Sequence, residues 1–441
     1  MPNDLLRGPS STTEMLAVFD DRALIEAMLA FEHALAESQA ECGIVPKEAA
    51  KVIGAMCDPT LYEVQTLATR SKVAGTLAIP LVQDLTRKVA ESDTGASAWV
   101  HFGATSQDVL DTALVLQLRT AVRLLEQHLE ILVEALGVLI EAHTHTVMLG
   151  RTLMQPATPI TFAHKARGWQ AAIVRGLDRM QATAHDALIL QLGGATGTLA
   201  AMGPAGPEVR KNLGERLNLP IAAEAWHAHR DRLVALTSTV AILVGTLGKM
   251  ARDISLLMQG EVGEAFEPEA PGRGGSSAMP HKRNPVGCMV ALAAATRVPG
   301  LLSSLLCAMV QEHERALGGW QAEWMIVPEI FEAAAGSFAA MCEVTQGLRV
   351  NDQAMEQNLA AVGALVLSER LSLRLARHYD RATAAQLIKE ACADSISQNQ
   401  PLAEVLAGDV RISAHLTAQE IADLLNPNTY LGTATPPGPK K

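Results

Sequence analysis

A short polar loop carries the densest set of reactive side chains in the sequence. It spans Gly275–Pro285, reads GSSAMPHKRNP, and lies within a glycine- and proline-rich segment at 268–285. Gly272 and Gly274 place little restraint on the backbone, so we expect a mobile segment. Such a loop can close over a substrate and exclude water. A solvated basic loop between two helices is the alternative, but a surface linker has little need for so many functional groups.

A second polar segment, HFGATSQD at 101–108, precedes a long apolar stretch. Thr105, Ser106 and the backbone amides that follow them are typical of a helix N-terminus, which can bind an anion. His101 and Gln107 lie in the same segment and are further candidate donors. The alternative is an ordinary helix cap that binds no ligand.

A third polar segment, RTLMQPATP at 151–159, joins two long apolar stretches. Thr152 and Gln155 could donate hydrogen bonds to a carboxylate. We expect a helix to start at Thr158-Pro159, because proline favours the first position of a helix. A simple turn between two helices is the alternative.

Two further features are less specific. Arg230 could bind a substrate carboxylate, or it could pair structurally with Asp231 or Glu224. His227 and His229 are two residues apart, so they would not share one face of a helix. This spacing argues against a metal pair, and we expect no metal site.

Long apolar stretches must position these segments. They cover about 108–150, 161–192, 221–262 and 286–316, with apolar residues every three or four positions in the first. Helices of this length, apolar around much of their circumference, indicate a bundle that assembles further between subunits. No run of alternating strands is visible. We therefore predict an all-α protein with three helical domains at 1–104, 105–350 and 351–441, and a disordered tail at 433–441.

The composition excludes several classes of function. The formal charge of −11 opposes binding to a polyanion, and an aromatic content of 3% leaves few side chains for stacking on bases. We therefore expect no nucleic-acid partner. No signal-type segment opens the sequence, and the most apolar stretch, 232–249, is too short to span a bilayer comfortably. The cysteines form no CxxC pair, which favours a reducing, cytoplasmic location; they are Cys42, Cys57, Cys288, Cys307, Cys342 and Cys392.

All three polar segments resemble signature regions of one family. GSSAMPHKRNP is similar to the signature of the fumarase/aspartase superfamily, and HFGATSQDVLDTA and RTLMQPATPITF are similar to its other two signature regions, in the right order along the chain. The resemblance covers nearly the whole chain. It implies a homotetramer around a central bundle of helices, with each active site assembled from three subunits. It also implies a small anionic polycarboxylate substrate and no cofactor.

The shared chemistry of that family is proton transfer next to a carboxylate, through an aci-carboxylate intermediate. By resemblance, Ser276 is the catalytic acid or base, activated by Lys282 and nearby backbone donors. Lys282 and Asn284 would also bind a substrate carboxylate. The full set of predicted substrate-binding residues is His101, Thr105, Ser106, Gln107, Gln155, Arg230, Ser277, Met279 and Asn284. His101 and His281 are possible auxiliary acids or bases.

The sequence departs from the lyase pattern at a pair of positions. Lyases of the superfamily carry a His–Glu acid pair where this chain has Leu153 and Met289. Joint loss of both partners indicates a reaction that needs no such acid. The branch that lactonises 3-carboxy-cis,cis-muconate fits, because the group that departs in the reverse direction is a carboxylate. The alternatives are a 3-sulfonated muconate, suggested by Leu153, Met154 and Pro156, an adenylosuccinate lyase-type reaction that releases fumarate, and a structural protein that has lost catalysis.

Overall fold

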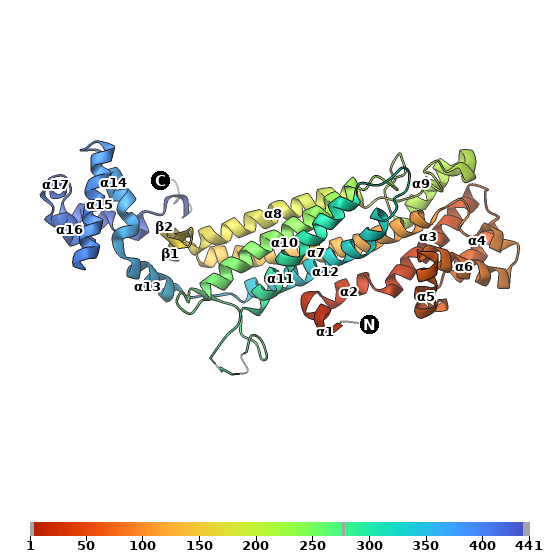
Figure 1. Cartoon of the computed structure of the whole chain (residues 1–441), viewed down its shortest axis with the longest axis horizontal. Helices are drawn as coiled ribbons and strands as arrows, with labels where there is room; N and C mark the ends of the chain where they lie inside the picture. Colours follow the sequence, from red (N-terminus) through yellow and green to blue (C-terminus); the bar gives the residue numbers. More distant parts are fainter. Residues whose placement is uncertain (1–3, 276–277, 280, 435–441) are drawn as a thin grey trace. The chain divides into compact units, whose positions relative to one another are not determined.

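The computed structural model describes residues 4–275, 278–279 and 281–434 and is mostly helical (Figure 1). The prediction of an all-α fold is confirmed. The helices are α1 (Asp4–Arg7), α2 (Thr13–Val18), α3 (Asp21–Glu41), α4 (Lys47–Met56), α5 (Val64–Ala74), α6 (Ala78–Ser92), α7 (Ser106–Ala142), α8 (Phe162–Ala187), α9 (Gly206–Leu217), α10 (Asp231–Leu257), α11 (Val286–Ala308), α12 (Gly319–Gln346), α13 (Asp352–Val362), α14 (Ser368–Leu375), α15 (Arg381–Gln398), α16 (Leu402–Gly408), α17 (Val410–Ser413) and α18 (Ala418–Leu424). The strands are β1 (Val147–Thr152), β2 (Gln155–Thr161), β3 (Ala265–Phe266) and β4 (Arg349–Val350).

The chain forms two compact units, and both draw residues from the five longest helices. The first contains 1–130, 174–248 and 289–341, and the second contains 131–173, 249–288 and 342–441. In the first, buried side chains of α3, α4 and α6 form one apolar core with the start of α7 and with α9. In the second, α14, α15, α16 and α18 share a separate core around Leu371 and Leu406. The division into three consecutive domains stays a prediction.

The predicted long helices exist, but each is shorter than its apolar stretch, and the third differs most at its start. The stretch 221–262 contains α10, which begins only at Asp231 and ends at Leu257. Residues before Asp231 use their backbone groups in tertiary hydrogen bonds instead of helical ones. The Trp226 N–H donates to the side chain of Gln191, and the His227 carbonyl accepts from the side chain of Gln107. These contacts hold the segment as a loop.

A β-hairpin replaces the expected helix start at Thr158-Pro159. Strands β1 and β2 pair antiparallel, with Thr152 opposite Gln155, and Pro159 lies inside β2. Leu153 and Met154 form the turn between them with φ of 49° and 65°, the left-handed conformation that two-residue hairpin turns require. Helix α8 begins at Phe162, and the Thr161 hydroxyl accepts a hydrogen bond from the His164 N–H, so Thr161 is the cap.

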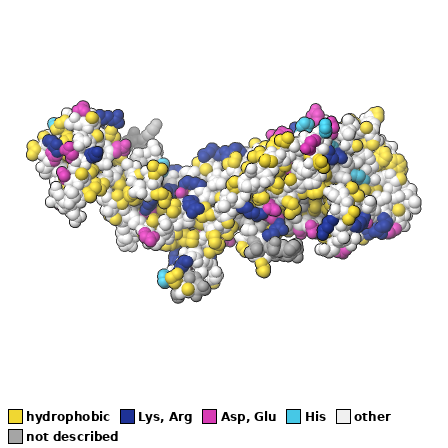
Figure 2. All heavy atoms as spheres, viewed as in Figure 1, with side chains coloured by type: hydrophobic (Ala, Val, Ile, Leu, Met, Phe, Trp, Pro, Cys, Tyr) yellow, Lys and Arg dark blue, Asp and Glu magenta, His cyan; other side chains and the backbone are white. Residues whose placement is uncertain are grey.

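By length and composition alone, three helices among the described residues could cross a membrane: α10, α11 and α12. This differs from the expectation that the stretch at 232–249, within α10, is too short. The most apolar windows of α10 and α12 are 67% buried, so the core accounts for their composition. The corresponding window of α11 is only 22% buried. Hydrophobic side chains are visible on the surface over the long helices in Figure 2, and those exposed on α11 include Met289 and Leu306.

The predicted disordered tail is wrong at its start. Thr433 and Ala434 belong to a short 3-10 helix at Gly432–Ala434, and Ala434 is buried. The Ala434 carbonyl accepts hydrogen bonds from the Thr161 hydroxyl, at 2.9 Å, and from Arg167. These bonds tie this part of the C-terminal segment to the start of α8. Residues 435–441 lie outside the described residues.

Candidate active site

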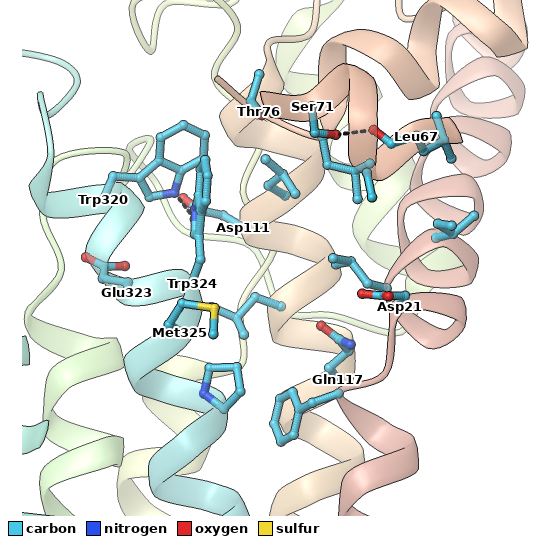
Figure 3. Close-up of a pocket in the computed structure, with 18 of the residues that line it drawn as sticks. Asp21, Leu67, Ser71, Thr76, Asp111, Gln117, Trp320, Glu323, Trp324 and Met325 are labelled. Atoms are coloured by element: carbon cyan, nitrogen blue, oxygen red, sulfur yellow. Dashed lines mark hydrogen bonds between the residues drawn. The ribbon is translucent and has the colours of Figure 1, made fainter. Parts of the chain in front are cut away.

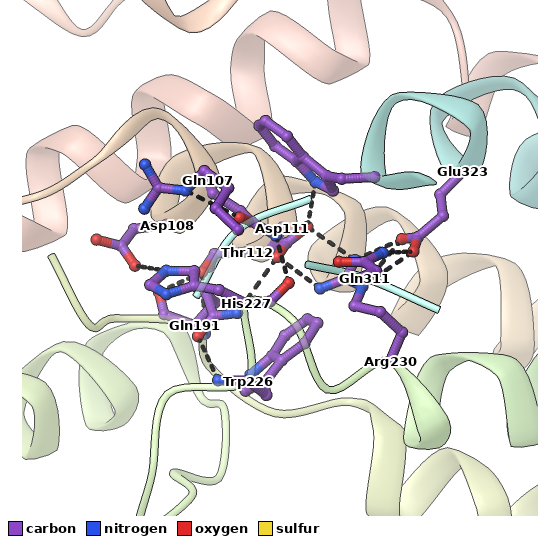
Figure 4. A network of polar contacts seen from close by, with 12 residues as sticks. Gln107, Asp108, Asp111, Thr112, Gln191, Trp226, His227, Arg230, Gln311 and Glu323 are labelled. Carbon is purple, nitrogen blue, oxygen red and sulfur yellow. Dashed lines mark hydrogen bonds and ion pairs between the residues drawn. The ribbon is translucent and has the colours of Figure 1, made fainter. Parts of the chain in front are cut away.

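A buried carboxylate fixes the start of α7. Asp108 accepts hydrogen bonds from its own helix start at Thr105 N, at 3.0 Å, and from Gly193 N and Gly194 N, both at 2.9 Å. The Nε2 atom of His227 lies 2.7 Å from its Oδ1 atom (Figure 4). The side chain of Asp108 is fully buried. Asp108 therefore joins the turn at Gly193-Gly194 and the loop before α10 to the segment 101–108, which is predicted to bind substrate.

The predicted donors on this segment differ in availability. Thr105 and Ser106 are half-buried, and within the described part of the chain neither hydroxyl has a hydrogen-bond partner. Gln107 is buried, with Nε2 donating to the His227 carbonyl at 2.8 Å and Oε1 accepting from Arg315 at 3.2 Å. Thr105 and Ser106 can therefore contact a ligand, whereas the amide of Gln107 is committed to internal contacts.

Two buried polar side chains of α3 contact the segment 101–108, and the sequence reasoning missed both. Glu32 lies 2.5 Å from the Nδ1 atom of His101, and Gln39 donates to the Phe102 carbonyl at 2.6 Å. Glu32 and Gln39 are seven residues apart and so lie on the same face of the helix. The available signal was a pair of polar residues on an otherwise apolar helix face.

Arg230 lies in an internal ion-pair network with Asp111 and Glu323 and, among the described residues, pairs with neither Asp231 nor Glu224. Its guanidinium donates to Asp111 at 2.7 and 3.0 Å and to Glu323 at distances from 2.6 Å, and it stacks over the Trp226 ring at 4.7 Å (Figure 4). Its side chain is fully buried. Burial opposes the charge, but the two carboxylates outweigh it and raise the pKa of Arg230. The geometry gives no support to the predicted substrate contact, because the guanidinium is already surrounded by internal partners.

The first unit contains a cavity of about 570 Å³ along α7 (Figure 3). Leu110, Asp111 and Leu114 line it, one to two turns after Ser106. Trp320 and Trp324 form another wall, with ring centroids 5.0 Å apart and planes at 86°. The cavity is mostly apolar, with Lys72, Asp21, Asp111 and Glu323 as its charged side chains.

The second unit contains the β1–β2 hairpin, which the third polar segment forms. Arg151 pairs with the fully buried carboxylate of Glu264 at 2.6 and 2.8 Å, which anchors the hairpin's end. Leu153 and Met154 at the turn are 96% and 70% exposed. Gln155, the predicted donor, follows them and is also exposed. Leu153, where the family resemblance leads one to expect a histidine, is therefore an exposed apolar side chain.

The signature loop is closed at its base. Asn284 N donates to the Gly274 carbonyl at 2.9 Å, and Gly274 has φ of 65°. A Cβ atom at Gly274 would lie 2.6 Å from the Asn284 carbonyl oxygen, so this position requires glycine. Ser276, Ser277 and Pro280 lie outside the described residues. The predicted base and one predicted substrate contact are among them.

Charged groups near the loop divide into paired and available ones. Arg283 pairs with Glu269, whereas in the described ranges Lys282 has no ion-pair partner. Lys282, His281 and Met279 are exposed. At the start of α11, Glu267 accepts from Gly287 N at 3.0 Å and Cys288 N at 2.8 Å. The ammonium of Lys282 can thus bind an anion, while the helix start is already capped.

The predicted site residues therefore divide between the units. His101, Thr105, Ser106, Gln107 and Arg230 belong to the first, and Gln155, Met279, Lys282 and Asn284 belong to the second. Among the described residues, no group of three or more His, Cys, Asp or Glu side chains is placed to hold a metal ion.

Comparison with known proteins defines the class. Residues 9–300 match the family described as "Lyase", and residues 364–436 match "Adenylosuccinate lyase C-terminus". The chain therefore belongs to the lyase family of the fumarase/aspartase superfamily.

Individual relatives show which members of the family the chain resembles. A 3-carboxy-cis,cis-muconate cycloisomerase of Pseudomonas aeruginosa is 46% identical over 98% of this chain and 94% of its own length. The crystal structure of the 3-carboxy-cis,cis-muconate lactonizing enzyme from Pseudomonas putida superimposes with a TM-score of 0.92 at 42% identity, covering 98% of this chain and 97% of that one. A fumarate lyase from Mesorhizobium sp. BNC1 is similar at 34% identity with a TM-score of 0.89, covering 96% of each chain.

Proposed function

We propose that the chain is a cycloisomerase that converts 3-carboxy-cis,cis-muconate into 4-carboxymuconolactone. The observation that carries this function is the near-full-length similarity, at 46% identity, to an enzyme of that name. The hairpin supports it, because Leu153 and Met154 at its exposed turn offer no acid for a departing group. A lyase that releases fumarate from an amine would need such an acid.

The reaction is an isomerisation in which one substrate carboxylate forms a C–O bond to the diene. The electron pair of the attacked double bond moves towards the neighbouring carboxylate and gives an aci-carboxylate intermediate. The Ser276 hydroxyl then donates its proton to the adjacent carbon, and the resulting alkoxide regains a proton from solvent, so the acid and its lactone have the same atomic composition. Lys282, which has no carboxylate partner in the described ranges, stabilises the negative charge that develops. Holding the substrate folded removes part of the entropic barrier. The reaction exchanges no electrons with an external acceptor, so we infer that it needs no cofactor.

The active form is a homotetramer in which the three signature segments of each site come from three subunits. The exposed apolar surface of α11 supports this arrangement, because a surface of that kind is covered in most soluble proteins. We also infer that the enzyme is soluble and cytoplasmic, because assembly would cover the apolar helices without a membrane.

Placing a charge on α11 is expected to break the assembly. Leu306 is 48% exposed on this helix, and Leu306→Glu would bury a carboxylate in the subunit contact. Light scattering coupled to gel filtration should show the wild-type tetramer and smaller species for the variant. Val410→Glu, at a residue 79% exposed on α17, is the control and should stay tetrameric. A monomeric wild type would contradict the tetramer.

Substrate choice is tested by following the loss of the conjugated diene in the ultraviolet. We expect kcat/KM for 3-carboxy-cis,cis-muconate to exceed that for the 3-sulfonated analogue by about tenfold or more, a difference of about 1.4 kcal/mol in transition-state binding. Adenylosuccinate should release no fumarate. A preference for the sulfonate, or fumarate release at a comparable rate, would refute the assignment.

A further inference from the structure

His101 is the one residue of the segment 101–108 that can carry a positive charge. The substrate proposed above is an anion, and the neighbouring Thr105 and Ser106 are neutral. The nearby arginines are engaged elsewhere: Arg230 by Asp111 and Glu323, and Arg315 by Gln107 and the Ala195 carbonyl. The charge state of His101 therefore decides whether this segment attracts or merely tolerates a carboxylate.

The environment of His101 favours the charged form. Its Nδ1 atom lies 2.5 Å from Oε1 of Glu32, whose side chain is 1% exposed. Burial disfavours the charge on the imidazole, but Glu32 outweighs this effect, Asp108 adds to it, and the pKa of His101 is raised. The other titratable groups beside Glu32 are Cys57 and Tyr62, and burial raises the pKa of both, which keeps them neutral.

The atoms of Glu32 and His101 that do not face each other have no other hydrogen-bond partner among the described residues. Glu32 Oε2 is buried and, within the described ranges, has no hydrogen-bond partner, so the carboxylate is committed to His101 alone. The Nε2 atom of His101 likewise has no partner there, and the imidazole is 16% exposed. His101 also adopts φ of 55°, an uncommon conformation for a residue other than glycine. Residues kept in such conformations are often held there for function.

We propose that Glu32 is a positioning residue that holds His101 as an imidazolium, so that the Nε2–H group of His101 binds a carboxylate of the substrate. The inference rests on the proposed function, because the His101 imidazolium would be the cation that binds that enzyme's anionic substrate. Glu32 itself does not touch the substrate. It fixes the ring through Nδ1 and keeps the charge, much as a carboxylate orients an imidazole in other sites.

The pH dependence of substrate binding tests this pair. A group whose pKa is raised in the folded protein is charged below that pKa, so substrate binding should weaken as the pH rises through it. In Glu32→Gln the pKa of His101 falls, and the rise in KM should move to lower pH. At neutral pH we expect KM to increase by about tenfold, because a charged hydrogen bond becomes a neutral one. At acid pH the two enzymes should converge.

The chain offers a matched control on the same helix. Glu37 also neighbours a histidine, His33, at 3.5 Å, but this pair is exposed. Glu37→Gln should leave the pH profile unchanged. In a His101→Asn background, Glu32→Gln should have no further effect on KM, because Glu32 acts through His101. A Glu32→Gln profile that matches that of Glu37→Gln would overturn the proposal.

A second measurement needs neither turnover nor a folded variant. Hydrogen–deuterium exchange at the His101 ring carbon of the wild-type protein, followed by mass spectrometry over pH, reports its titration directly. A midpoint at or below that of exposed His33 would overturn the proposal. If the wild type fails to convert 3-carboxy-cis,cis-muconate, the proposed function falls, whereas normal turnover with an unmoved Glu32→Gln profile rejects only the pairing.

Discussion

Replacing Ser276 with alanine is expected to lower kcat for 3-carboxy-cis,cis-muconate by about 10²–10⁴-fold, the usual contribution of a positioned acid or base. The variant would lose the hydroxyl that we propose as the proton donor to the aci-carboxylate carbon. KM should change little, because Lys282 and Asn284 remain to bind the carboxylates. The loss of diene absorbance under saturating substrate measures the effect.

The fold should survive this change, because the described residues on either side of position 276 are joined by the Gly274–Asn284 hydrogen bond. Gel filtration and circular dichroism of Ser276→Ala should match the wild type. Ser397→Ala, at an exposed position on α15, is the control and should keep full activity. If Ser276→Ala also keeps full activity, another group transfers the proton.

Replacing Arg230 with methionine is expected to destabilise the protein by about 3–5 kcal/mol, the typical cost of removing one partner from a buried ion pair. Asp111 and Glu323 would remain buried without their cation, and both side chains are nearly inaccessible to water. The Asp111 carboxylate would keep only its hydrogen bonds from Trp320 and Gln191. Urea-induced unfolding or the midpoint of thermal unfolding measures the loss.

Arg411→Met provides the matched comparison. Arg411 also binds two carboxylates, Asp409 and Glu390, but its side chain is 55% exposed. Solvent screens exposed ion pairs, so this variant should be nearly as stable as the wild type. Equal losses in the two variants would contradict the account of Arg230. A large rise in KM for Arg230→Met at unchanged stability would instead restore its predicted contact with substrate.

The hairpin shows where local sequence patterns mislead. Pro159 favours the first turn of a helix, but here it lies in a strand at the edge of a two-stranded sheet, where the missing N–H costs little. Leu153 and Met154 have no residue-level preference for the left-handed turn that they form. The pairing of β1 with β2 imposes that conformation, so the preferences of the single residues do not predict the turn.

The sequence by itself determined the family, the long helices and the signature segment at 275–285, because each can be recognised from residues that are adjacent or at helical spacing. Only the tertiary structure decided the partners of the buried charges. Glu32 and His101 are 69 residues apart, and Arg230 is 119 residues from Asp111 and 93 from Glu323. Such pairs form because packing removes both groups from water, where an unpaired charge is costly. The separation of two residues along the chain does not indicate whether they pack together. For this reason Arg230 was predicted to bind substrate and Glu32 was overlooked.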